Sequence, residues 1–300
     1  MALKVIRGGD ITRMGVGFQT KFKGALANAT SLYPKIATPV TSTTRLEEYG
    51  WLSDLPSIRE WIGDRKIREA SANVYRVPNK DWEGTLGVDR NDVMDDNLGL
   101  YGTKIDMLAE AAGRHKDELL FQMLGDGFAS DCYDGQYFFD TDHPVIDKDG
   151  GETSFSNFGG GAGAAWFLLV TGGALKPLII QERTDYQFVS QDSPNSEGVF
   201  WQKKFFYGCD ARYNGAYTLP QLAWGDKNTL DDAHFEAAYD GLLAMPKDGG
   251  GKVAPIGFTL VVGPSNRAAG EKVVGAEFLA GGASNVNYKK ADLIVAPWLE

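Results

Sequence analysis

The stretch CYDGQYFFDTDHPVIDKDGG, residues 132–151, concentrates side chains that bind metals or transfer protons in many enzymes. Its five such residues within ten positions are Asp140, Asp142, His143, Asp147 and Asp149. A histidine among carboxylates is typical of hydrolytic metal sites, where the metal activates a water molecule. Aspartate and glycine are also ordinary turn formers, since an Asp side chain bonds the backbone two residues further on. The stretch therefore predicts either a metal site or a set of turns.

The stretch does not complete the pattern of a calcium-binding loop. Such a loop needs oxygen ligands at positions 1, 3 and 5, a glycine at position 6 and an acid at position 12. Counted from Asp140, position 5 is Pro144, and counted from Asp147, position 12 is Phe158. A structural cation held by Asp140, Asp142 and Asp147 stays open as an alternative.

A hydrolytic metal site would need ligands that converge from several segments. The other two histidines, His115 and His234, lie within helical patterns. We therefore expect the carboxylates to shape turns between strands, so that replacing Asp140 or His143 by alanine changes stability only modestly. The alternative is a metal-dependent hydrolase that uses Asp140, Asp142 and His143.

No other catalytic or cofactor-binding signature occurs in the sequence. There is no G-x-S-x-G motif, and neither Ser130 nor Cys132 has an adjacent activating histidine. The glycine clusters GGGAGAAW and KDGGGK do not match a phosphate-binding loop. Cys132 and Cys209 lie far apart, which argues against a disulfide framework or structural zinc and favours a reducing compartment. We expect a protein that is not an enzyme and needs no cofactor.

The composition of the chain excludes further classes of function. The chain of 300 residues is 43% hydrophobic, which is enough to fill a sizeable core. Its 30 basic and 40 acidic side chains give a net charge of −10, which opposes tight, extensive binding to nucleic-acid phosphates. The longest apolar run, AAWFLLV, is far short of the roughly 20 residues that span a bilayer. We expect no membrane insertion and no sequence-specific DNA binding.

Patterns with helical periodicity occur in both halves of the chain. The first amphipathic segment carries Ile11, Met14, Phe18, Phe22 and Leu26, and it is typical of an arm rather than a core. The strongest helical pattern covers residues 92–127, as one helix or as two that break at Gly113. Further helices are expected from a cap at Asn228 or Thr229, and from Pro264 to about Ala280.

Strand patterns dominate the second half of the chain and place it in the α+β class. The expected strands are AWFLLVT, LKPLIIQE, YQFVSQ, KKFFYGCDARYNGAYT, FTLVVG and the closing ADLIVAPWL.

Residues 47–92 alternate turn signals with short β-prone pieces, which predicts an extended hairpin. This segment is rich in Trp and Arg, the residue types enriched at interface hot spots. The candidates for contact with another subunit are Trp51, Arg59, Glu60, Trp61, Asp64 and Arg65, with Trp61 as the central anchor. An ordinary half-buried hairpin is the alternative, because aromatic strands also pack within their own fold.

Several long strings resemble one known family. LSDLPSIREWIGDR, VDRNDVMDDNLGLY, CYDGQYFFDTDHPV, AWFLLVTGGALKPLIIQER, YGCDARYNGAY and ADLIVAPWL occur in this order and are similar to the Mu-like phage and prophage major head subunit, the gpT family. The resemblance implies a major capsid protein with the Hong Kong 97 type of fold. Such a protein self-assembles into the icosahedral shell that encloses the phage genome.

The resemblance also implies a division of the chain. Residues 1–46 would form the N-terminal arm, 47–91 the extended loop and 92–127 the spine helix of the peripheral domain. Residues 128–285 would form mainly the axial domain, and 286–300 a strand that returns to the peripheral domain.

The implied partners follow from the same resemblance. They are further copies of the chain in hexameric and pentameric capsomers, a scaffold protein, the portal and other head proteins, with double-stranded DNA enclosed but not read. The implied location is the virion, after assembly in the host cytoplasm. An encapsulin-like nanocompartment shell, which encloses enzymes instead of a genome, is the alternative of the same fold.

Overall fold

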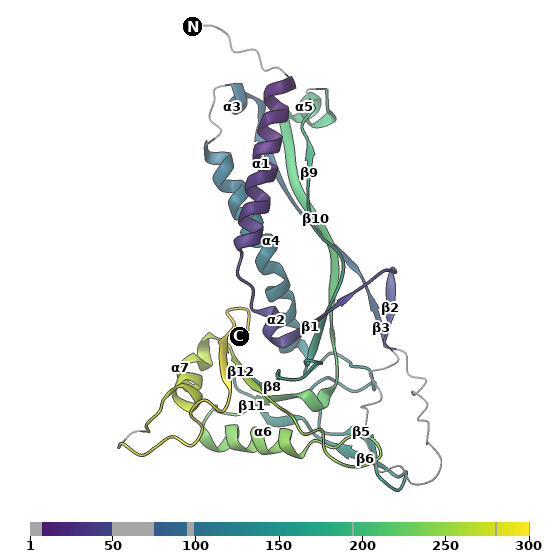
Figure 1. The fold of residues 1–300 in the computed structure, drawn as a ribbon, viewed down its shortest axis with the longest axis vertical. Coiled ribbons are helices and arrows are strands. Elements are labelled where there is room, and N and C mark those ends of the chain that lie inside the picture. Colours follow the sequence, from purple (N-terminus) through teal and green to yellow (C-terminus); the bar gives the residue numbers. More distant parts are fainter. Residues whose placement is uncertain (1–7, 50–74, 95–98, 194, 280, 300) are drawn as a thin grey trace.

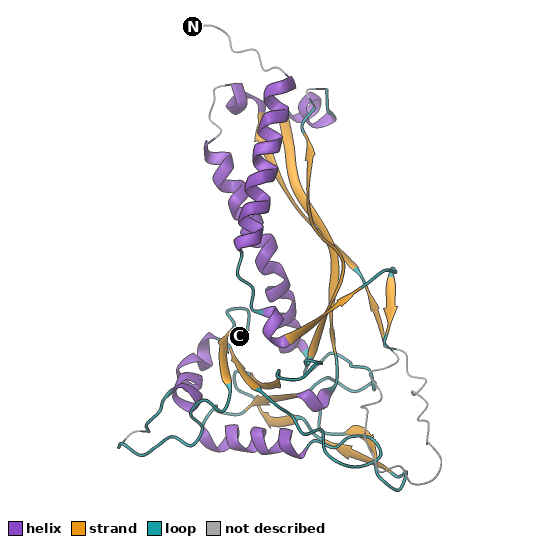
Figure 2. Ribbon diagram, viewed as in Figure 1, coloured by secondary structure: helices purple, strands orange, loops and turns teal. Residues whose placement is uncertain are grey.

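The computed structural model describes residues 8–49, 75–94, 99–193, 195–279 and 281–299. The molecule has a tall, narrow part, in which two helices run beside long strands, and a wider base built on a second sheet (Figure 1). Helices and strands contribute to both parts (Figure 2), as the α+β prediction requires.

Two long helices, α1 (Gly8–Asn28) and α4 (Gly99–Asp126), lie side by side in the narrow part (Figure 1). Their buried apolar side chains share one cluster, which includes Ile11, Met14, Phe18, Phe22, Ile105, Ala109 and Ala112. The prediction that the first amphipathic segment lies outside a core is therefore wrong. Its apolar face covers α4 and the long strands instead of solvent.

Helix α4 continues without a break through Gly113, where the sequence pattern predicted an interruption. A Cβ atom at Gly113 would lie 2.4 Å from the Cβ of Ala29, just after the end of α1. The glycine is therefore explained by the close approach of the two segments. It does not end the helix, because tertiary packing outweighs the modest helix propensity of glycine.

Polar contacts fix α4 to its neighbours. The Lys116 ammonium lies 2.7 Å from a carboxylate oxygen of Glu182 on the adjacent sheet. The Asp117 carboxylate accepts hydrogen bonds from the backbone N–H groups of Leu32 and Tyr33, at the start of α2 (Tyr33–Ile36). These contacts set the position of α4 between α2 and the sheet.

The sheet of the narrow part has the strand order β1-β9-β10-β4. Its members are β1 (Ala37–Thr41), β9 (Leu178–Gln191), β10 (Lys204–Tyr217) and β4 (Lys80–Asp89), which is followed by α3 (Arg90–Met94). Strand β1 is parallel to β9, and the other pairs are antiparallel. Strands β9 and β10 form a long hairpin closed by α5 (Glu197–Gln202). The two strands predicted at LKPLIIQE and YQFVSQ are thus one strand.

The sheet of the base has the order β13-β12-β8-β11-β7. Its members are β13 (Asp292–Val295), β12 (Phe258–Val262), β8 (Trp166–Val170), β11 (Ala223–Lys227) and β7 (Phe158–Gly161). The closing strand was expected to return to the sheet beside the long helix. It pairs in parallel with β12 instead.

Strand β8 is buried on both faces, which explains its uninterrupted apolar sequence. Phe167 and Leu169 face the cluster shared with Leu120 and Leu124 of α4. The alternate residues of β8 face a second cluster with α6 (Asp232–Ala244). The five-stranded sheet therefore joins the base to the narrow part through continuous apolar packing.

The remaining elements are short. Helix α6 is capped by Asp231, whose carboxylate accepts the N–H of His234, and not by the predicted Asn228 or Thr229. The helix predicted from Pro264 to Ala280 ends sooner. It consists of a turn at Pro264–Asn266, α7 (Arg267–Gly270) and a wide turn at Glu271–Gly275.

Two short antiparallel strand pairs are also present. They are β2 (Leu46–Glu48) with β3 (Arg76–Pro78), and β5 (His143–Ile146) with β6 (Glu152–Phe155), of which the second is a hairpin. Among the described helices, none has the length and apolar character needed to cross a membrane.

Candidate functional site

The histidine of the acidic stretch is a core residue. His143 opens β5 and is fully buried. Its Nδ1 atom lies 2.7 Å from Oδ2 of Asp134, and its Nε2 atom lies 3.2 Å from Oδ1 of Asn157. A side chain held on both ring nitrogens positions the loop before β5 against the start of β7.

The hydrogen bonds of Asn157 show which of its atoms faces His143. Its amide nitrogen donates to the carbonyl oxygens of Phe138 and Pro220, at 2.8 and 3.1 Å. Its oxygen accepts the N–H of Asp140 at 2.9 Å, so it faces His143 as an acceptor. Nε2 then faces Asn157 as a donor, and Nδ1 lies within hydrogen-bond distance of the Asp134 carboxylate. We conclude that His143 is a buried ring held between Asp134 and Asn157.

Asp134 is surrounded by hydrogen-bond donors. Burial raises the pKa of its carboxyl, but hydrogen bonds from His143, the Cys132 thiol and the backbone N–H of Gln136 outweigh burial and hold the pKa below its usual value. The Cys132 Sγ atom lies 2.9 Å from Oδ1 of Asp134. Burial and the Asp134 charge raise the pKa of the Cys132 thiol far above its usual range, so Cys132 is a hydrogen-bond donor and not a nucleophile.

These three residues also have the types of a metal site. The ligand atoms of Cys132, Asp134 and His143 lie within 4.8 Å of one another, and in the part of the chain that the structure describes no other group of three has this spacing. A zinc site would need the thiolate and a free ring nitrogen. Here the Cys132 thiol bonds Asp134, and both ring nitrogens of His143 lie within hydrogen-bond distance of protein oxygens. The contacts fit a closed hydrogen-bond network better than a metal site.

The predicted ligand set of a hydrolase does not form. His143 bonds Asp134 and Asn157, and neither Asp140 nor Asp142 joins the one metal-like group among the described residues. The structure favours a larger effect of replacing His143 than the sequence predicted, because the fully buried ring bonds Asp134 and Asn157 in two different segments.

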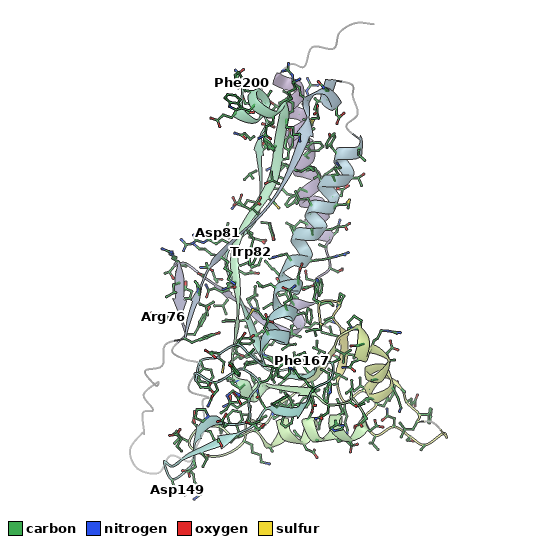
Figure 3. The ribbon with its side chains drawn as sticks, turned by 180° about the vertical axis from the view of Figure 1, so that it is seen from behind. Arg76, Asp81, Trp82, Asp149, Phe167 and Phe200 are labelled. Atoms are coloured by element: carbon green, nitrogen blue, oxygen red, sulfur yellow. The ribbon has the colours of Figure 1, made fainter. Side chains whose placement is uncertain are left out.

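The turn-forming role predicted for the carboxylates is confirmed at two positions. Asp147 Oδ1 accepts the N–H groups of Asp149 and Gly151, both at 2.8 Å, and so shapes the tip of the β5–β6 hairpin. Asp140 Oδ1 accepts the N–H of Thr141 at 2.7 Å. Figure 3 shows Asp149 at the outer end of this hairpin, away from the core.

The residues predicted to contact another subunit all lie outside the described part of the chain. They are Trp51, Arg59, Glu60, Trp61, Asp64 and Arg65. The described ends of their segment are firmly placed. The Tyr49 N–H donates to the carbonyl of Tyr75 at 2.9 Å, and the Tyr49 hydroxyl donates to Gln181 on β9 at 2.8 Å. The described ends of this segment, Tyr49 and Tyr75, therefore lie next to each other beside the four-stranded sheet.

One exposed apolar site escaped the sequence analysis. Phe200 and Trp201 on α5 are 75% and 76% exposed at the end of the β9–β10 hairpin. Figure 3 shows Phe200 at the extremity of the narrow part. The sequence feature that could have indicated this site is a pair of adjacent aromatic residues in the polar segment that connects the two strands. Aromatic residues so exposed mark interaction sites more often than chance.

Comparison with known proteins identifies the family to which this chain belongs. The profile of the family described as "Mu-like prophage major head subunit gpT" matches residues 11–299. The chain belongs to this family.

The relatives agree over almost their whole length. The chain is 39% identical over 287 residues to the "Mu-like prophage FluMu major head subunit" of Haemophilus influenzae, covering 93% of each chain. It is 34% identical over 304 residues to the "Major capsid protein" of Escherichia phage Mu, covering 98% of this chain and 100% of the relative. Among solved structures, a chain of the procapsid of bacteriophage JBD30 superposes with a TM-score of 0.87 and 42% identity, covering 98% of this chain and 100% of that one.

These similarities fix the fold and the class of function. The gpT-family chain has the Hong Kong 97 type of phage capsid fold and is a major capsid protein. It is a structural protein and not an enzyme, which agrees with the protonated thiol and the closed hydrogen-bond network around Asp134.

Proposed function

We propose that this chain builds the closed icosahedral shell of a phage head from hexameric and pentameric capsomers and that the shell encloses double-stranded DNA. The observation that carries the proposal is the match to the JBD30 procapsid chain over 98% of the sequence. The net charge of −10 supports an inner surface that does not grip the genome, because phosphate contacts dominate affinity for DNA.

We propose roles for the parts of the chain as follows. Residues 1–46 act as the arm, 47–91 as the extended loop, 92–127 as the spine of the peripheral domain, and 128–285 mainly as the axial domain, closed by 286–300. Two features modify this proposal. Strands β9 and β10 belong to the sheet beside α4, and β13 belongs to the sheet of the base.

A scaffold protein, the portal and other head proteins are the proposed partners, and the host cytoplasm is the proposed place of assembly. The family role supports these assignments. A shell subunit of net charge −10 needs basic or neutral surfaces on such partners.

Electron cryo-microscopy of particles from cells that produce the complete head tests the proposal. We expect closed shells with capsomers of fivefold and sixfold symmetry and nuclease-protected double-stranded DNA inside. Shells filled with protein cargo and free of nucleic acid would instead support the nanocompartment alternative.

The extended loop has its own test. We propose that Trp61 anchors contacts between subunits, with Arg59, Glu60, Asp64 and Arg65 at the rim and Trp51 beside it. Trp61→Ala should then give folded, soluble subunits or open rings without closed shells, since losing an aromatic anchor costs on the order of 2 kcal/mol per contact. Tyr137→Ala, at an exposed aromatic residue in the turn before β5, is the matched control. If Trp61→Ala unfolds the subunit, Trp61 is a core residue and this assignment fails.

A further inference from the structure

The end of the β9–β10 hairpin presents a rigid aromatic pair. The rings of Phe200 and Trp201 meet edge to face, with centroids 4.8 Å apart and planes at 89°. About three quarters of each side chain is exposed. No described residue covers them, although aromatic residues of this size each bury about 150–250 Å² when they are packed.

The short helix that carries this pair is held in place from below. Val199 is buried among the residues of the α1–α4 cluster, and a Cβ atom at Gly198 would lie 2.3 Å from the Phe206 ring. Lys203 closes the helix in the left-handed region, at φ 56°, and its carbonyl accepts the N–H of Arg90 at 2.9 Å. The exposure of the pair therefore follows from a fixed backbone and not from a loose loop.

A complementary cleft lies between α1 and α4 at the same end of the molecule. It has a volume of about 560 Å³ and is lined by Arg13, Met14, Gly17, Phe18, Lys21, Gly99 and Gly102. Apolar walls come from Met14 and Phe18, which are otherwise largely buried, and two basic side chains border the opening. A cleft with this lining suits an aromatic group, because cations at its edge attract aromatic faces.

Two glycines of the cleft have no close packing neighbour among the described residues. A Cβ atom at Gly17 or at Gly99 would meet nothing within 4 Å, and neither residue has positive φ. Glycine within a helix costs roughly 0.5–1 kcal/mol relative to alanine. Contacts inside the described subunit therefore do not explain these residues, whereas an approaching neighbour would.

The arrangement of the elements favours a second copy of the chain as the occupant. Figures 1 and 3, seen from opposite sides, agree that α1 stands between α5 and the first turns of α4. Phe200 thus lies on the side of the narrow part away from the first turns of α4, and α5 and the start of α4 both lie in its upper half. Copies packed side by side bring the pair of one against the cleft of the next, as in the head-to-tail contacts that close rings. The exposed Glu197 on α5 adds a charge opposite to that of Arg13 and Lys21.

We infer that Phe200 and Trp201 of one subunit insert into the α1–α4 cleft of an adjacent subunit during shell assembly. This inference rests on the proposed function, because it needs identical subunits in a closed array.

Disulfide trapping tests the contact directly. Subunits with Trp201→Cys and subunits with Gly17→Cys are mixed, assembled and oxidised, while the native Cys132 and Cys209 stay buried. We expect cross-linked dimers only in mixed assemblies. Neither variant alone should give them, and Trp201→Cys mixed with Ile256→Cys, an exposed residue just before β12, should give none. Mixed shells that form without cross-links would overturn the inference and leave the shell function intact.

A second pair of variants tests the same contact without cysteine substitutions, in case the cysteine variants assemble poorly. Gly17→Trp fills the cleft, whereas Gly24→Trp adds the same ring to α1 where the structure shows nothing within 4 Å of a new Cβ atom. We expect Gly17→Trp to lower the yield of shells at least tenfold and Gly24→Trp to leave it near that of the wild type, with both subunits folded. Equal yields would contradict the inference. If wild-type chains form no shells at all, the proposed function fails and not merely this contact.

Discussion

At the scale of single residues, the buried pair of His143 and Asp134 is the feature that substitutions can test most directly. Taking a carboxylate out of water is costly, and only good geometry with hydrogen bonds offsets that cost. Here His143, Cys132 and Gln136 bond Asp134, and Asn157 bonds the other side of the His143 ring. Removing Asp134 leaves these buried groups without their acceptor.

We expect Asp134→Asn to lower the free energy of unfolding by about 1–3 kcal/mol, because the variant removes the carboxylate that bonds His143, the Cys132 thiol and the Gln136 N–H. Urea denaturation of unassembled subunits measures this loss. Asp142→Asn, an exposed residue in the same stretch, is the control and should change stability by less than about 0.5 kcal/mol. Equal, small effects in both variants would show that the pair does not hold the loop.

The pair also predicts a pH dependence. The pKa of Asp134 in the folded subunit is below the ordinary value of 3.8, so its contribution is fully present above that value and is lost as pH falls through the lower, folded pKa. The difference in unfolding free energy between wild type and Asp134→Asn should therefore be smaller at pH 3 than at pH 5. A difference that grows on acidification would contradict the assignment of an ionised Asp134.

The sequence indicated part of this site. It marked His143 and the acidic stretch, and it predicted the turn at Asp147. It did not predict the partner Asp134, because the network also includes Asn157, a loop residue just before β7. Turn propensities are local, whereas this network is made by tertiary contacts.

At the scale of elements, buried strands were predictable and long polar ones were not. Strands β8 and β12 are continuous apolar runs, so their sequences identify them directly. Strand β9 was divided into two because its polar middle, Glu182 to Asp185, resembles a turn. It stays in one strand since hydrogen bonds to β10 continue through it, past two register shifts. The helix of residues 11–26 was placed outside the core because amphipathicity does not say what covers the apolar face.

The two glycines Gly113 and Gly24 test the packing of α1 on α4. Gly113→Ala should destabilise the subunit by about 1–3 kcal/mol, because the new Cβ atom meets Ala29 Cβ at 2.4 Å and forces the helices apart. Gly24→Ala meets nothing within 4 Å and should stabilise it by about 0.5–1 kcal/mol through helix propensity. Thermal denaturation of unassembled subunits gives both values. Stabilisation by both substitutions would show that the approach at Gly113 is not tight.

At the scale of the whole molecule, the described chain combines a folded core with exposed sites that its own described residues do not cover. Continuous apolar clusters join the base to the narrow part, so the subunit has a core of its own. The aromatic pair of α5 and the cleft between α1 and α4 both lie at its margins. A folded core with interaction sites at the margins is what repeated, modest contacts in a shell require.

Sedimentation velocity of the purified chain, across a range of concentrations and with or without a scaffold protein, tests the central claim most directly. A shell subunit should pass from a 32.7 kDa species to capsomers and to particles of megadalton mass as concentration rises. The account predicts this concentration-dependent assembly. A single 32.7 kDa species at every concentration, with scaffold present and absent, would contradict it.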